Sequence, residues 1–187
     1  MSSNLVRWGG LAALLAAVMY VGTGIVSLFA PQGPVFTSFS DYLIEVMFVI
    51  ALLGTLAAIA GLHALQRERY GRLGAAGSLT AFVGHALMLV AATATALAGR
   101  EALDALFPLG VLVALVGLVL LGAATLRARM LPRWCGVLLI AVLPLSAVLD
   151  IATGGAGGIV LGIVWALVGY TLLSNSNVPV QRFPRVS

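Results

Sequence analysis

The sequence has no lysine, one cysteine and few charged side chains. Charged residues make up only 9% of the 187 residues, whereas a soluble domain carries about 25%. Without a lysine amine the chain cannot form the Schiff base that holds retinal or pyridoxal phosphate. Cys135 stands alone, which excludes an internal disulfide and a cysteine-cluster metal site. The low charge requires lipid, not water, around most of the surface.

Long apolar segments account for most of the chain, which is 61% hydrophobic with a mean hydropathy of +1.13. A helix needs about 20 apolar residues to cross a bilayer. The pattern predicts an all-α, polytopic bundle of six transmembrane helices in residues 1–174, followed by a cytoplasmic tail in 175–187. The expected spans are Trp8–Phe29, Asp41–Leu65, Leu73–Ala98, Leu103–Leu126, Trp134–Leu149 and Gly157–Leu173.

The first span is too long for the apolar core of a signal peptide, and Leu28 stands where a cleavage site after Ala30 would need a small residue. We therefore expect it to be an uncleaved first helix. The last two spans are short, and we expect them to form a tight hairpin around 150–158. Similar Arg-Trp and Arg-Leu-Gly starts would fit three hairpins in one orientation, but the general preference for arginine anchors at cytoplasmic helix starts explains them better.

The arginines gather in alternate connecting segments, so that threading the spans puts nine of the ten on one side. Positive residues stay in the cytoplasm, which predicts that both termini are cytoplasmic. A composition rich in Ala, Gly and Arg favours a GC-rich bacterium, and hence its inner membrane. Since these arginines mark helix ends, we expect no nucleic-acid binding. They are Arg7, Arg67, Arg69, Arg72, Arg127, Arg129, Arg133, Arg182 and Arg185.

Small residues form ridges that let helices approach closely in lipid. Gly158, Gly162 and Ala166 make one such ridge, and Ala57–Gly61 and Gly77–Ala81 make two shorter ones. Ridges of this kind pack helices within one chain or against another subunit. The partners we expect are membrane lipids, together with other membrane subunits or a second copy of the chain.

Two ionisable residues stand inside the predicted spans, and such residues are functional candidates. Glu45 lies one turn inside the second span with Asp41 on the same face, where the pair suits a cation or simply reaches the headgroups. His85 lies near the middle of the third span. It suits a ligand, a proton relay or a plain hydrogen bond to another helix, with Tyr20 as one partner.

Haem is not expected, because His63 lies near the cytoplasmic end of its span, about 15 Å in height from His85. The sequence indicates no other cofactor. Tyr20, Glu45, His85 and Trp165 all fall at or outside mid-depth. If they converge, they line a small cavity that opens to the outer side, of the kind that binds ligands between helices.

Three functions stay open at this point. The first is a non-enzymatic subunit or scaffold of a membrane complex, favoured by short loops and small-residue ridges. The second is a binding or transport component for a small solute or cation, with a pocket around Glu45 and His85. Its size and topology resemble the substrate-binding subunits of energy-coupling-factor uptake systems, without a shared motif. An intramembrane enzyme comes last, because no nucleophile and base stand at matching depths.

Overall fold

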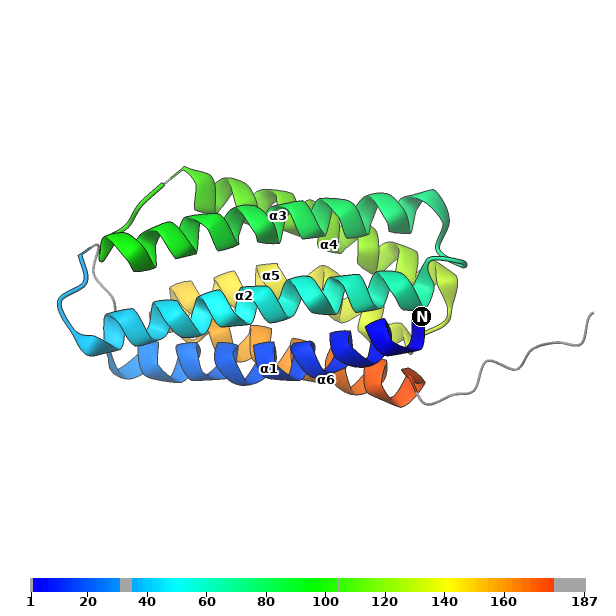
Figure 1. Cartoon of the computed structure of the whole chain (residues 1–187), viewed down its shortest axis with the longest axis horizontal. Coiled ribbons are helices and arrows are strands. Elements are labelled where there is room, and N and C mark those ends of the chain that lie inside the picture. The colour runs from blue at the N-terminus through cyan, green and yellow to red at the C-terminus, as the bar shows by residue number, and fades with distance from the viewer. Residues whose placement is uncertain (1, 31–34, 104, 177–187) are drawn as a thin grey trace, which may run out of the picture.

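Six α-helices make up nearly all of the described chain (Figure 1). The structure is a computed structural model that describes residues 2–30, 35–103 and 105–176. Each helix is long and apolar enough to cross a membrane, so the chain is a multi-pass membrane protein and the predicted fold class is confirmed. The helices are α1 (Ser2–Phe29), α2 (Phe39–Gln66), α3 (Gly71–Ala98), α4 (Leu106–Ala128), α5 (Arg133–Thr153) and α6 (Gly157–Ser176).

The helix bounds differ from the predicted spans mainly at three places. α1 begins at Ser2, six residues before the predicted Trp8. α4 begins at Leu106 and not at Leu103, because Leu103 has a left-handed backbone with φ of 56° and its carbonyl accepts a hydrogen bond from the Leu106 amide. α5 and α6, predicted to be short, contain 21 and 20 residues. At 1.5 Å per residue each is about 30 Å long, which matches the hydrocarbon core of a bilayer.

Consecutive helices run antiparallel, and the chain closes into a ring. The closest packing joins α3 to α4, α1 to α2 and α1 to α6, whereas α5 packs less closely on both of its neighbours. The contact between α6 and α1 brings the last helix back to the first, so the start of α1 and the end of α6 lie at the same end of the bundle (Figure 1). The predicted tail falls almost wholly in 177–187, outside the described residues.

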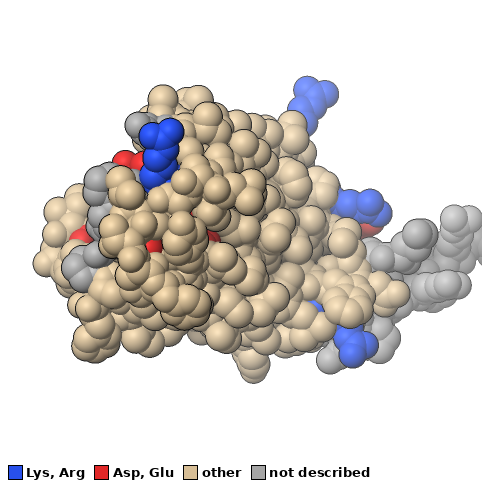
Figure 2. Space-filling model, turned by 60° about the vertical axis from the view of Figure 1, so that its left-hand side comes forward, with Lys and Arg blue, Asp and Glu red and all other residues tan. Residues whose placement is uncertain are grey.

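Charged side chains lie mainly at the two ends of the bundle, and the part of the flank that Figure 2 shows carries almost none. We call one the arginine-rich end, where α1, α3 and α5 begin. Its described arginines are Arg7, Arg67, Arg69, Arg72, Arg127, Arg129 and Arg133. The other is the acidic end, where α2, α4 and α6 begin, and it holds Asp41, Glu45, Glu101 and Asp150 together with Arg100. Asp104, Arg182 and Arg185 lie outside the described residues.

The small-residue ridges of the sequence pack within the chain. A Cβ added at Gly162 of α6 would lie 2.6 Å from the Ala17 carbonyl oxygen of α1. One at Gly77 of α3 would lie 2.5 Å from the Leu121 amide nitrogen of α4, and Gly61 of α2 faces α1 at a similar separation. Because each ridge is already occupied by a neighbouring helix, none of them remains as a contact surface for another subunit.

The bundle is filled unevenly along its length. Toward the arginine-rich end, Leu62, Leu121, Leu139 and Leu172 come from four different helices and have no exposed surface at all. They belong to one hydrophobic core of buried residues. Toward the acidic end the same six helices enclose open space instead.

Candidate functional site

A cavity of about 720 Å³ occupies the acidic half of the bundle. All six helices contribute to its wall, together with the loops that precede α4 and α6. Those loops lie at the acidic end, so the cavity reaches the surface there, and the packed core closes it below. Its volume falls in the range of about 300–1,000 Å³ that is usual for small-molecule sites.

The wall is built from one face of each helix. On α3 the lining residues are His85, Met88, Ala92 and Thr95, spaced by three or four positions. On α1 they are Tyr20, Thr23 and Ser27, with the same spacing. Side chains three or four positions apart stand above one another on a helix, so each helix turns one continuous stripe toward the cavity.

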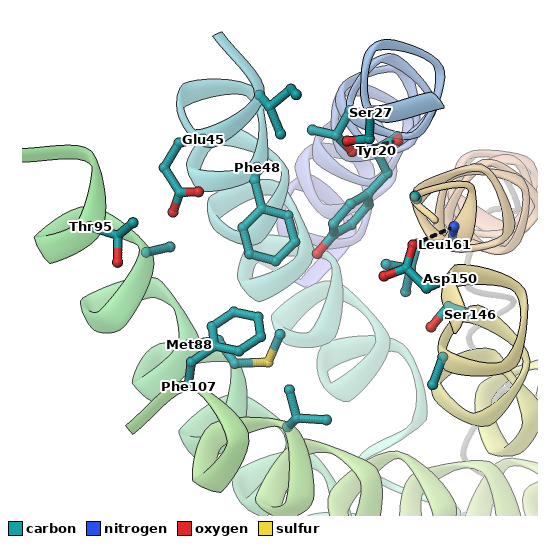
Figure 3. A pocket seen from close by; sticks show the side chains of 18 of the residues that line it. Tyr20, Ser27, Glu45, Phe48, Met88, Thr95, Phe107, Ser146, Asp150 and Leu161 are labelled. Atoms are coloured by element: carbon teal, nitrogen blue, oxygen red, sulfur yellow. Dashed lines mark hydrogen bonds between the residues drawn. The ribbon is translucent and has the colours of Figure 1, made fainter. Parts of the chain in front are cut away.

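Glu45 of α2 is the acidic side chain that reaches deepest into this wall. It is half-buried and points into the space between α2 and α3, toward Thr95 (Figure 3). Among the described residues, no hydrogen bond or ion pair satisfies its carboxylate. A carboxylate inside a membrane span is costly unless something compensates it, so Glu45 remains a candidate binding group of the cavity.

Three aromatic rings run side by side along the cavity wall. Tyr20 of α1 meets Phe48 of α2 with ring centroids 5.9 Å apart, and Phe48 meets Phe107 of α4 at 5.9 Å (Figure 3). The Tyr20 hydroxyl accepts a hydrogen bond of 3.4 Å from Thr55 Oγ1. The rings form one aromatic row, and Phe48 stands three positions after Glu45 on the same helix face.

His85 lines the inner part of the cavity and is only 2% exposed. Its Nδ1 lies 2.8 Å from the Ala81 carbonyl oxygen of its own helix. A carbonyl can only accept, so Nδ1 donates and a neutral ring keeps Nε2 as an acceptor. The hydrogen bond is therefore within α3 and not between helices. Trp165 does not line the cavity and instead packs edge-on against His85, with centroids 6.5 Å apart.

Asp41 is a helix cap and does not line the cavity. Its Oδ2 accepts hydrogen bonds of 2.8 Å from the backbone amides of Thr37 and Ser38, and the Ser38 hydroxyl accepts one from the Asp41 amide. This reciprocal capping box starts α2. The sequence placed Asp41 and Glu45 on one helix face, but only Glu45 belongs to the cavity wall.

Asp150 holds the loop at the mouth of the cavity through a hydrogen bond to the start of α6. Its Oδ1 accepts a hydrogen bond of 2.9 Å from the Gly157 amide at the start of α6. The loop itself needs glycine, because Gly154 and Gly155 have φ angles of 73° and 151°. The glycine-rich stretch is thus a turn, as the sequence predicted, and Asp150 lines the cavity from its edge.

The two histidines lie in different halves of the bundle. His63 stands near the arginine-rich end, where its Nδ1 bonds to the Tyr70 hydroxyl, and that hydroxyl also lies 3.1 Å from Ser78 Oγ. His85 belongs to the cavity. Within the described ranges, no three His, Cys, Asp or Glu side chains gather closely enough to hold a metal ion.

Several cavity residues were not predicted from the sequence to line a pocket. Phe48, Met88, Phe107 and Ser146 all line the space, yet each is an ordinary apolar or small residue in a transmembrane helix. The signal was their spacing: Phe48 follows Glu45 by three positions, and Met88 follows His85 by three. Listing the residues three or four positions from each polar candidate would have identified these two residues.

Comparison of the sequence and fold with protein-family models, curated proteins and solved structures gave no match. What the fold and site define is a class: a six-helix, multi-pass membrane protein with a cavity inside the bundle.

Proposed function

We propose that this protein binds a small solute within the bundle and serves as the binding component of an uptake or sensing system. The cavity carries this proposal. It is large enough for a small organic molecule, mainly apolar in its walls, and supplied with a few polar groups such as Glu45 and His85. Those are the usual properties of a ligand site between helices.

The contrast between the two halves of the bundle supports the same function. A chain that served only as a scaffold would gain stability by filling its acidic half as it fills the other, since voids in a core are destabilising. The small-residue ridges, which favoured a scaffold, are occupied by helices of the same chain. The Ser146 hydroxyl of the cavity donates to the Leu143 carbonyl of its own helix and not to a base.

We place the arginine-rich end in the cytoplasm, because positive residues flank cytoplasmic helix ends. The chain then sits in the cell's inner membrane with its N-terminus on the cytoplasmic side. The cavity opens away from the cytoplasm, in the position from which a binding protein collects a solute outside the membrane.

Native mass spectrometry of the protein, extracted mildly from its own host, tests this proposal. The wild type should carry a discrete small-molecule mass. Ala147 lines the cavity on α5 and is exposed, so Ala147→Trp should fill the space and remove that mass. Ala152→Trp is the matched control, since Ala152 is exposed on the same helix but outside the cavity lining.

Two results would contradict the proposal. One is a wild-type protein that never carries a small molecule yet co-purifies in fixed stoichiometry with other membrane subunits, which would restore the scaffold function. The other is a bound mass that persists unchanged in Ala147→Trp.

A further inference from the structure

We infer that the solute is a small organic cation, an amine or quaternary ammonium with an apolar body, held between Glu45 and the aromatic row of Tyr20, Phe48 and Phe107. This inference rests on the proposed function, because it specifies the ligand of the same cavity. Three observations support it: the negative charge of the cavity wall, the aromatic rings beside Glu45, and the unpartnered Nε2 of the buried His85.

The charge of the wall has one sign. Three carboxylates line the cavity, Glu45, Glu101 and Asp150, and none of its lining residues is an arginine. Arg100 is exposed at the acidic end and lies outside the lining. A recess lined by charges of one sign between low-dielectric walls concentrates the opposite ion. The wall therefore attracts cations and repels carboxylates, phosphates and sulfonates.

The aromatic row supplies the second half of ammonium recognition. A cation over an aromatic face gains about 0.5–2 kcal/mol, more where water is excluded, and quaternary ammonium groups are recognised in this way. Phe48 stands one turn from Glu45 and contacts a ring on either side, Tyr20 and Phe107. The Glu45 carboxylate, near three aromatic rings that contact one another, suits a cation that also has an apolar surface.

His85 indicates that the inner part of the cavity receives a ligand as well. The side chain of His85 lines the cavity and is only 2% exposed. Its Nδ1 donates a hydrogen bond to the Ala81 carbonyl oxygen. Its Nε2 has no hydrogen-bond partner within the described part of the chain and is left as an acceptor. A ligand that places an O–H or N–H group there would satisfy it.

A bare metal cation fits this wall poorly. Divalent ions require several oxygen or nitrogen ligands at about 2.0–2.6 Å, and the acidic and histidine side chains of the cavity do not cluster in that way among the described residues. Glu45, with the aromatic row beside it, instead matches a cation that needs one close counter-charge.

The charge preference of the cavity is measured with a single thiol. Cys135→Ser removes the native thiol, and Ser146→Cys places one in the cavity wall. In membrane vesicles the thiol reacts with methanethiosulfonates that carry a trimethylammonium group, a sulfonate or only a methyl group. Ala152→Cys is the reference position on the same helix outside the cavity. The cation-to-anion rate ratio at position 146 should exceed that at position 152 by about tenfold.

Glu45→Gln tests the residue itself. It should lower the rate ratio at position 146 several-fold, with Glu101 and Asp150 keeping part of the preference. The methyl reagent's rate should be unchanged, which shows that the fold is intact. Glu45→Asp should keep the preference. Glu68→Gln is the control, because Glu68 is an acid at the arginine-rich end. Benzyltrimethylammonium should protect the Ser146→Cys thiol in a Glu45-dependent manner, and its neutral isostere neopentylbenzene should not.

The outcomes separate the two proposals. Suppose that the methyl reagent reacts at position 146 but the cationic reagent reacts no faster than the anionic one. The proposed cavity is then supported, and the inference of a cationic ligand is contradicted. Equal protection by benzyltrimethylammonium and neopentylbenzene leads to the same conclusion. If even the methyl reagent fails to react at position 146, the open cavity is wrong, and the proposed function and the ligand class fall together.

Discussion

The seam between α1 and α6 closes the ring of helices, and Gly162→Ala should weaken it. An added Cβ would lie 2.6 Å from the Ala17 carbonyl oxygen and 3.0 Å from the Val21 amide nitrogen. The first distance is 0.8 Å inside the 3.4 Å at which ordinary contact begins. Both atoms belong to the backbone of α1 and cannot rotate away, so the two helices must separate.

The cost of this separation follows from close packing. Forcing an extra carbon into a filled interface destabilises a protein by about 1–3 kcal/mol. Alanine favours a helix over glycine by roughly 1 kcal/mol, which offsets part of the loss. Because the clash is with backbone atoms, the cost falls at the upper end of that range. We therefore expect Gly162→Ala to lower the free energy of unfolding by about 2 kcal/mol, measured by denaturant titration in mixed micelles with tryptophan fluorescence.

Gly22→Ala is the matched control on α1, the other helix of the seam, at a position that faces α2. Its Cβ would meet only the Met47 side chain, with the sulfur at 3.1 Å, and a methionine side chain moves easily. This variant should match the wild type or be slightly more stable. The reasoning fails if Gly162→Ala is as stable as the wild type, or if Gly22→Ala loses as much stability.

Three further predictions concern groups outside the cavity wall. Tyr70→Phe should cost about 1 kcal/mol in the same titration, because the hydroxyl joins His63 to Ser78, and an unchanged midpoint would contradict this. Asp41→Ala should also cost about 1 kcal/mol through loss of the α2 cap, while a change in the charge preference of the cavity would show that Asp41 belongs to the site. Cys135 is 1% exposed and should react with thiol reagents only on unfolding, so rapid labelling of the native protein would refute its burial.

The number of helices, and the ends at which charge gathers, could be predicted from the sequence. The low charge of the chain indicates a membrane protein, and the length of each apolar run indicates a membrane span. All six spans were predicted. Helix ends were less certain. The start of α4 depends on the left-handed backbone of Leu103, which an apolar run does not reveal.

The site was predicted only in part, because convergence depends on how the helices rotate. Tyr20, Glu45 and His85 were all placed at or outside mid-depth, and the structure brings them to one cavity. Trp165 also falls in that depth range but packs against His85 outside the cavity lining. The Asp41 carboxylate accepts hydrogen bonds from backbone amides at the start of its own helix. Depth follows from counting residues, whereas the direction in which a side chain points follows from the packing of neighbouring helices.

The hollow acidic half is the central claim, and a cysteine profile along α3 tests it most directly. In the Cys135→Ser background, single cysteines replace Thr95, Ala92 and Met88 in the cavity wall, and Ala81 and Ser78 in the packed half. Intact cells are treated from outside with the small methyl methanethiosulfonate. We predict reaction at positions 95, 92 and 88 and none at 81 and 78. A uniformly unreactive helix, or one that reacts along its whole length, would contradict the account.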